Sequence, residues 1–277
     1  MDAKRALVHA IVMSLRPFQH RYRKRSVMEQ REQQGVETLR NWIRESSNIV
    51  FFGGAGVSTE SGIPDFRSVD GLYQQKYAYP PEAIISHSFY MRNPEEFYRF
   101  YRDRMLYPEA KPNAAHLALA KLEAAGKLRA VITQNIDGLH QAAGSHEVLE
   151  LHGSVHRNYC THCGKFFPLS AVLESEGVPY CDVCGGVIKP DVVLYEEGLD
   201  PAVLEKAVRY IAEAEVLIVG GTSLVVYPAA GLIDYYRGSR LALINRDQTG
   251  RDSAADLCIH ARIGEVLNAA VTGCEAP

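Results

Sequence analysis

The sequence has no run of 18 or more apolar residues, although 47% of its 277 residues are hydrophobic. A membrane-spanning helix needs about 20 consecutive apolar residues, so we expect no membrane insertion. The first residues also lack the uninterrupted apolar segment and the small-residue cleavage site of a secretory signal. We therefore expect a globular, cytoplasmic protein with one large domain, or with a large and a small one.

Cysteine is scarce, since the chain contains only six, too few for a disulfide scaffold at this length. Four of them form two Cys-x-x-Cys pairs, Cys160 with Cys163 and Cys181 with Cys184, separated by 17 residues. This spacing suits four thiolates around one structural zinc ion, with no position left for water, in a reducing compartment. A redox-active dithiol is the alternative, and His162 is a further candidate ligand.

Net positive charge is confined to the start of the chain. Residues 1–27 carry a formal charge of +6, which leaves −9 for residues 28–277, because the whole chain carries −3. An acidic body disfavours direct binding of nucleic acid, so we expect none. We interpret residues 1–27 as a basic leader. It is either a disordered tail or not native, and in the second case Met28 is the true start. Binding of an anionic partner or organelle targeting is the alternative.

Apolar, strand-like segments alternate with helix-like segments along the body of the chain. The expected strands are 48–52, 130–133, 148–151, 216–221 and 241–245, and the expected helices are 36–43, 116–125, 201–212 and 228–236. This alternation is typical of an α/β protein with a parallel sheet covered on both faces. In such sheets ligands bind beyond the carboxyl ends of the strands.

The stretch FFGGAGVSTESGIPDFRS, residues 51–68, places a glycine-rich loop directly after an expected strand. Gly53, Gly54 and Gly56 allow a tight turn whose amide groups approach a phosphate, which suits a dinucleotide. The spacing is not Gly-x-Gly-x-x-Gly, so a simple turn is the alternative. The segment Asp65-Phe66-Arg67 would cover a cofactor and hold its charge, or else form an internal ion pair in a surface loop.

Two other strand ends carry polar side chains. Gln134, Asn135 and Asp137 follow one expected strand, where they face a ligand or, for Asp137, cap the next helix. His152 follows another, and Gly153 lets the chain bend away so that the imidazole faces a cleft. A histidine titrates near neutral pH and can take a proton from a hydroxyl, although a lone histidine is more often structural.

In combination these segments resemble the sirtuin family, the NAD-dependent protein lysine deacylases of the silent information regulator type. The resemblance covers about residues 28–265 and rests on GAGVSTESGIPDFRS, TQNIDGLHQAAG, LHGSV, the two cysteine pairs, GTSLVVYPAA and LIN. It implies a large Rossmann-like parallel-sheet domain made of about residues 28–68, 112–155 and 190–277. A small domain would be inserted in it, with a helical segment at 69–111 and a zinc-ribbon module at 156–189.

The resemblance also assigns roles to single residues. His152 would be the general base, and Asn135 and Asp137 would orient the ribose and a water. The residues expected around NAD are Gly54, Ala55, Gly56, Thr59, Asp65, Phe66, Arg67, Gln134, Asn135, Ile136, Asp137, His152, Gly221, Thr222, Ser223, Asn245 and Arg246. Those expected at the substrate peptide are Val193, Tyr195, Glu197 and Val225, with the segments VVLYEEG and LVVYP pairing with the peptide as strands.

The implied reaction consumes NAD, releases nicotinamide and transfers the acyl group from lysine to ADP-ribose. Relatives that remove succinyl or malonyl groups bind the acyl carboxylate with a Tyr-x-x-Arg pair. Here Tyr101 stands three residues after Tyr98, and the arginine is Arg102. One residue rotates a helical side chain by about 100°, so we expect Arg102 to point away from the acyl pocket and acetyl-lysine to be the substrate.

Other functions remain open on these residues. Desuccinylase or demalonylase activity, or protein ADP-ribosyl transfer, would use the same scaffold. A non-catalytic zinc-ribbon adaptor would need only the cysteines. The loop on the peptide side reads Tyr195-Glu196-Glu197, where the family usually has Phe-Gly-Glu. We expect a monomer whose partners are acyl-lysine proteins or peptides.

Overall fold

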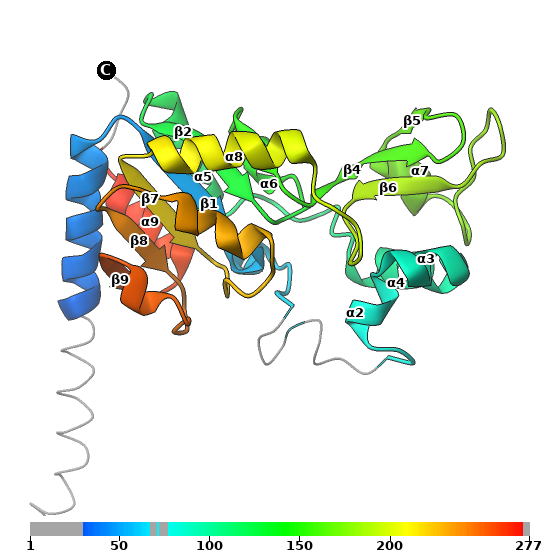
Figure 1. Ribbon diagram of the computed structural model, residues 1–277, viewed down its shortest axis with the longest axis horizontal. Coiled ribbons are helices and arrows are strands. Elements are labelled where there is room, and N and C mark those ends of the chain that lie inside the picture. The colour runs from blue at the N-terminus through cyan, green and yellow to red at the C-terminus, as the bar shows by residue number, and fades with distance from the viewer. Residues whose placement is uncertain (1–29, 67–70, 72–76, 274–277) are drawn as a thin grey trace, which may run out of the picture.

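The computed structural model of the chain describes residues 30–66, 71 and 77–273 (Figure 1). The basic leader and Arg67 lie outside these residues, so the predictions made for them stay predictions. No helix in the described part of the chain is long and apolar enough to cross a lipid bilayer.

A six-stranded parallel sheet forms the larger part of the molecule and confirms the predicted α/β class. Its order is β3-β2-β1-β7-β8-β9, and every neighbouring pair is parallel. The strands are β1 (Ile49–Gly53), β2 (Leu128–Thr133), β3 (Val148–Glu150), β7 (Val216–Gly220), β8 (Leu241–Ile244) and β9 (Leu257–Ile259). The sequence predicted all of these except β9.

Both faces of this sheet are buried under helices. Successive residues of a strand point to opposite faces, so each strand contributes to two cores. Ile49 and Phe51 face a core shared with the helix at 30–45, α5 (Ala114–Ala124) and α9 (Ile263–Val271). Val50 and Phe52 face the opposite core, shared with α8 (Pro201–Glu213) and the 3-10 helix η4 (Ala229–Tyr235). Burial on both sides explains why these strands read as continuous apolar runs.

Side-chain caps begin two of the helices that cover the large sheet. Asn113 accepts a hydrogen bond from the Ala115 amide at 2.9 Å and so caps α5. Asp200 caps α8 through the Ala202 amide at 2.7 Å, ahead of Pro201 in the first turn. The predicted helix at 228–236 is η4, whose turns close between residues three apart, as from the Gly231 amide to the Pro228 carbonyl.

A smaller part of the molecule lies beyond one end of the large sheet (Figure 1). Its antiparallel sheet has the order β5-β4-β6, formed by β4 (Gly153–Cys160), β5 (Phe166–Phe167) and β6 (Ile188–Val192), beside α7 (Leu169–Leu173). Helices α2 (Pro81–Ile84), α3 (His87–Arg92) and α4 (Pro94–Arg104) pack against this sheet through an apolar cluster that includes Phe97, Val155 and Val192. This arrangement is the inserted zinc and helical module that the sequence predicted.

Candidate active site

The loops that follow β1, β2, β3, β7 and β8 meet at the carboxyl edge of the large sheet. They include the short helices η1 (Ala55–Val57), η2 (Thr59–Ser61) and α6 (Leu139–Ala142), while η5 (Asp252–Ala254) follows the β8 loop. The sheet order reverses at β1, since β2 lies on one side of it and β7 on the other, and crevices form at such a switch point. A cavity of about 1130 Å³ opens there, between the large sheet and the smaller part.

The structure brings nearly all of the predicted site residues to this one cavity. Those expected around NAD that line it are Gly54, Ala55, Gly56, Thr59, Asp65, Phe66, Gln134, Asn135, Ile136, Asp137, His152, Gly221, Thr222, Ser223, Asn245 and Arg246. Val193, Tyr195 and Glu197 line it as well. Val225 does not: its side chain is 54% exposed, whereas its neighbours Val226 and Tyr227 face the cavity.

The glycines after β1 are required by contact with the loop after β7. A Cβ on Gly56 would lie 2.8 Å from the Cα of Gly221, and the Gly56 amide donates to the Gly221 carbonyl at 2.7 Å. A Cβ on Gly54 would lie 2.9 Å from the Cβ of Thr222. Close packing of two loops therefore excludes side chains here, a constraint that the phosphate-loop interpretation of the sequence did not include.

Asn135 and Asp137 are joined through Ser58, which the sequence analysis did not single out. The Ser58 hydroxyl donates to Oδ2 of Asp137 at 2.6 Å and accepts from Nδ2 of Asn135 at 3.0 Å. Oδ1 of Asp137 accepts from the Leu139 amide at 2.9 Å, an Asx-type turn just before α6, whose N-cap position is Gly138 and not Asp137. Ser58 is 1% exposed, and that burial holds the three side chains in one arrangement.

His152 is held by a hydrogen bond between its Nδ1 and the Gln134 carbonyl, at 2.9 Å. Because a carbonyl only accepts, Nδ1 carries the proton and Nε2 of the neutral ring is left as a base. Burial lowers the pKa of His152 and the bond to Gln134 opposes this shift. Gly153 turns the chain with φ of 75°, and a Cβ there would lie 1.9 Å from the Asp191 carbonyl oxygen. The local geometry therefore suits proton acceptance from a hydroxyl in the cavity.

The loops after β2, β7 and β8 are tied to one another by side-chain amides. Gln134 Nε2 donates to the Thr222 hydroxyl at 3.1 Å, and the Thr222 amide donates to Oδ1 of Asn245 at 3.0 Å. Nδ2 of Asn245 is buried and has no hydrogen-bond partner among the described residues. A buried orphan donor at the rim of a cavity fits a ligand with polar groups, such as a nucleotide ribose.

The segment expected to pair with a peptide already uses its backbone donors. The amides of Val193 and Tyr195 donate to the carbonyls of His152 and Ile85, each at 3.0 Å. The Leu194 amide donates to the Glu197 carboxylate at 2.9 Å. Strand-like pairing with a substrate therefore has to use the remaining groups of this segment, and it stays a prediction.

Arg102 points away from the cavity, as the helical geometry predicted. Its Nε donates to the Val172 carbonyl at 2.8 Å and its Nη2 to the Ser175 hydroxyl at 2.6 Å, on and after α7. The guanidinium lies 5.5 Å from the ring centre of Tyr98, whose hydroxyl donates to the Ile188 carbonyl. Arg102 therefore joins α4 to the zinc module and is not placed to bind an acyl carboxylate.

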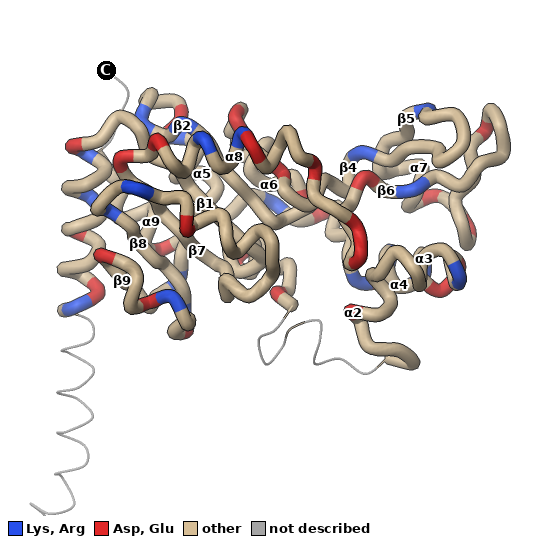
Figure 2. Tube along the Cα trace, viewed as in Figure 1, with Lys and Arg blue, Asp and Glu red and all other residues tan. Residues whose placement is uncertain are grey.

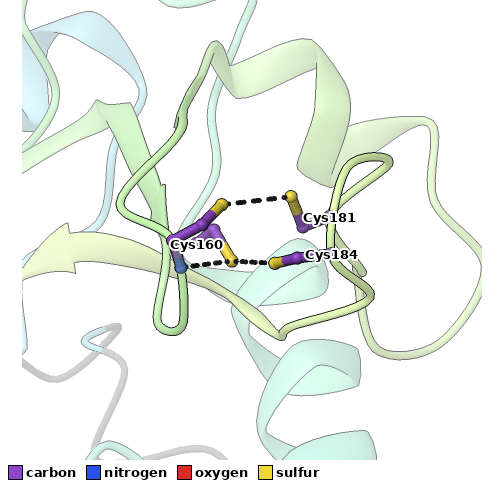
Figure 3. Close-up of side chains that lie close together, drawn as sticks. Cys160, Cys181 and Cys184 are labelled. Atoms are coloured by element: carbon purple, nitrogen blue, oxygen red, sulfur yellow. Dashed lines mark hydrogen bonds between the residues drawn. The ribbon is translucent and has the colours of Figure 1, made fainter.

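Four thiol groups form a candidate metal centre in the smaller part (Figure 3). The sulfur atoms of Cys160, Cys163, Cys181 and Cys184 all lie within 4.8 Å of one another, with 3.4 Å between those of Cys160 and Cys184. Tetrahedral zinc with Zn–S bonds of about 2.3 Å places sulfurs about 3.8 Å apart, so the set fits zinc. His162 does not belong to this group of close ligand atoms among the described residues.

The backbone around the thiols is shaped for the metal. The amides of His162 and Val183 lie 3.4 Å from the sulfurs of Cys160 and Cys181, where N–H groups stabilise thiolates. A Cβ on Gly186 would lie 2.8 Å from the Cys160 sulfur. A closed set of four sulfurs leaves no position for water, so the centre is structural and lies apart from the cavity.

Two buried histidines, His116 and His140, lie close to Asp137, and no local pattern of the sequence indicates either. The rings of His116 and His140 are 4.7 Å apart, and each side chain is at most 1% exposed. Burial lowers the pKa of His140 to about 3, and lowers that of His116 to about 4 although the charge of Asp137 opposes the shift. Both rings are therefore neutral near pH 7.

Comparisons of the sequence and of the structure with known proteins point to the same family. A sequence profile of the Sir2 family matches residues 54–228. An NAD-dependent protein deacetylase of Clostridium acetobutylicum is 59% identical over 239 residues, which cover 85% of this chain and 98% of that protein. A Sir2 structure with a deacetylated p53 peptide and 3'-O-acetyl ADP ribose superposes with a TM-score of 0.79 at 40% identity, covering 87% and 99% of the chains. A Sir2–p53 peptide–NAD+ structure gives 0.73 at 42%, covering 82% and 93%.

Proposed function

The chain belongs to the Sir2 family and is an NAD-dependent protein deacetylase, and from this premise we propose which of its residues carry the reaction and on which substrate. The substrate is an acetyl-lysine protein or peptide. NAD supplies the ADP-ribose group that accepts the acetyl group, with release of nicotinamide. A relative crystallised with a deacetylated peptide and 3'-O-acetyl ADP ribose supports this outcome.

His152 acts as the general base. The observation that carries this role is the bond from Nδ1 to the Gln134 carbonyl, because it leaves Nε2 unprotonated beside the cavity that Asn135 and Asp137 also line. A base in this position takes the proton of a ribose hydroxyl, which makes that oxygen a better nucleophile toward the acyl carbon. The lowered pKa keeps the ring neutral, and so able to act, at physiological pH.

Asn135 and Asp137 position the ribose and a water through the arrangement that Ser58 holds. Asn135 gives one amide hydrogen to Ser58, which leaves its other amide hydrogen and its carbonyl oxygen for a ligand. Fixed side chains of this kind lower the entropy cost of reaching a reactive geometry. Asn245, with its unpaired Nδ2, completes the set at the end of β8, where it would hold the adenosine ribose.

The acyl group is acetyl. Apolar side chains line the cavity near the peptide segment, among them Ile85, Ile136 and Val155. An acidic acyl group would bring a carboxylate into these surroundings, where an unpaired charge is costly. Arg102 is engaged by α7 and its following loop and does not compensate that charge. Arg104 lines the cavity as well, but its guanidinium forms an ion pair with Asp103 at 2.7 Å.

Zinc at the four cysteines holds the small module together. The protein works in the cytoplasm, where thiols persist in the reduced state.

The test of the whole proposal is nicotinamide release by the purified protein. Acetyl-, succinyl- and unmodified-lysine peptides are compared, with His152→Ala as control. Release that requires acetyl-lysine and yields O-acetyl-ADP-ribose supports the proposal. A succinyl preference, or labelling of protein by ADP-ribose without peptide, contradicts it.

A further inference from the structure

We propose that Glu196 makes the enzyme favour substrates with a lysine or arginine beside the acetylated lysine. The inference rests on the proposed function, since it concerns the peptide that enters the same cavity. Tyr195, Glu196 and Glu197 form the loop that leaves β6 toward α8, and all three line the cavity. Figure 2 shows red, acidic positions on the segment between β6 and α8, next to the part of the molecule that holds α2 to α4.

Glu196 has an unusual backbone conformation, and its side chain is fixed by hydrogen bonds. Glu196 has φ of 75°, a left-handed conformation that is unfavourable for a residue with a Cβ and that glycine adopts freely. The side chain offsets this cost through Ser88 in α3. Its carboxylate accepts from the Ser88 amide at 2.8 Å and from the Ser88 hydroxyl at 3.0 Å. The carboxylate is therefore held in one position at the cavity rim.

The neighbouring Glu197 differs from Glu196 because basic side chains lie within ion-pair distance of its carboxylate. Partial burial would raise the pKa of Glu197, but the Leu194 amide, His87 and Lys189 outweigh it and lower this pKa. His87 Nδ1 lies 2.8 Å and Lys189 Nζ 3.2 Å from its oxygens, so the Glu197 charge is compensated.

Glu196 forms no ion pair with a lysine or arginine within the described ranges, and its two hydrogen-bond donors both belong to Ser88. Arg92 lies one hydroxyl away, since its Nη2 donates to the same Ser88 hydroxyl at 3.3 Å. The residue is also exposed to solvent. Without a direct ion pair, the Glu196 carboxylate remains at the rim for a peptide to meet, and Arg92 offsets only part of its charge through Ser88.

A carboxylate that is already fixed attracts a cation without losing further rotamer freedom. The same charge repels an acidic residue in the same place. For an exposed pair the combined effect is modest, and we expect a ratio of about three- to ten-fold in kcat/KM between a basic and an acidic neighbour. Screening by salt should reduce this ratio.

The experiment compares two acetyl-lysine peptides that differ only in having arginine or glutamate beside the acetyl-lysine. The enzymes are the unchanged protein, Glu196→Gln, Glu196→Gly and the control Glu174→Gln, which removes one charge from an exposed position after α7. Glutamine keeps an acceptor for Ser88 without the charge, and glycine suits the backbone. Thermal unfolding verifies that each variant is folded.

We expect the arginine peptide to be preferred about three- to ten-fold, less so at high salt, with the ratio near one in both Glu196 variants and unchanged in Glu174→Gln. Equal turnover of the two peptides by the unchanged protein would overturn the inference while leaving deacetylation intact. A preference that survives in Glu196→Gln would also overturn it, because Glu196 would then only anchor the loop. Absence of any acetyl-lysine-dependent nicotinamide release would overturn the proposed function, and this inference with it.

Discussion

The hydroxyl of Ser58 donates a 2.6 Å hydrogen bond to the carboxylate of Asp137, and thereby links the loop after β1 to the loop after β2. The same hydroxyl accepts the amide of Asn135 at 3.0 Å. Two residues proposed to orient the ribose thus depend on a third that is almost fully buried.

Ser58→Ala should therefore impair catalysis more than stability. Without the hydroxyl, Asn135 and Asp137 lose their shared partner, and we expect kcat/KM for NAD to fall about 10- to 100-fold. Steady-state kinetics with saturating acetyl peptide measures this effect. Ser58→Thr keeps a hydroxyl and should retain more activity than alanine. Equal losses in both variants would indicate that packing, not the hydrogen bond, is what matters.

The pH dependence of kcat/KM should report His152. Burial lowers its pKa below the ordinary 6.5, so the neutral, active form persists to lower pH than for an exposed histidine. Activity should fall on the acid side with a midpoint below 6.5. His152→Gln should remove this limb and lower the rate by about 10²- to 10⁴-fold. An acid limb that remains in His152→Gln would assign the titration to another group.

Acid should destabilise the fold through His140 and His116. Their folded-state pKa values, about 3 and about 4, lie below the ordinary 6.5. As the pH falls, the unfolded chain therefore takes up protons before the folded protein does. The contribution of these two histidines to the free energy of unfolding is fully present above about pH 6.5 and decreases as the pH falls toward 4. Each histidine contributes a slope of up to about 1.4 kcal/mol per pH unit.

Denaturant unfolding between pH 7 and 4.5 measures that slope. His140→Phe keeps an aromatic ring but cannot be protonated, so its stability should depend less on pH. His146→Gln, at an exposed histidine, is the matched control and should leave the slope unchanged. A slope that is the same in all three proteins would contradict the assignment.

Metal removal should unfold the small module. Zinc binding contributes folding energy to modules with little core of their own, and the cluster around these cysteines contains few buried apolar side chains. Cys184→Ser should lose the metal, measured as zinc per chain, and lower the thermal midpoint. Cys258→Ser, at a cysteine outside the cluster, should keep one zinc per chain. Full zinc content in Cys184→Ser would show that three sulfurs suffice.

Arg102→Met should destabilise the protein without altering acyl preference. The guanidinium holds a carbonyl and a hydroxyl of the zinc module, and hydrogen bonds from a charged group each contribute about 1.5–3 kcal/mol. Chemical denaturation measures the loss, and acetyl against succinyl turnover measures the preference. A selective loss of succinyl turnover would place Arg102 in the acyl pocket after all.

Signals local to the sequence predicted most of the fold. Strand β1 reads as IVFF because both of its faces are buried, and the cysteine spacing alone indicates a four-sulfur site. Strand β9 was missed because its apolar segment ends at Ile259 after three residues, whereas the segment that predicted β3 continues to Leu151. The 3-10 geometry of η4 was missed because the same apolar spacing suits either kind of helix.

The candidate site was predictable where residues follow strands, and less so where they depend on contacts distant in sequence. Asn135, Asp137 and His152 stand at strand ends and are visible as such. Ser58 is one serine within a loop, and its importance arises only when residues 79 positions away come within 2.6 Å. His116 and His140 were missed for the same reason, since their rings meet only in the folded chain.

The paired strands β4 and β6 run from the cavity to the four-cysteine metal centre. The near end of β4 follows His152, and that of β6 precedes Val193. Their far ends, Cys160 and Ile188, pair with each other and pack with Cys181. Cys163 and Cys184 are exposed. The zinc centre thus stands at the solvent-accessible end of two paired strands whose other ends meet His152 and Val193, so the structural metal and the reacting groups share one support.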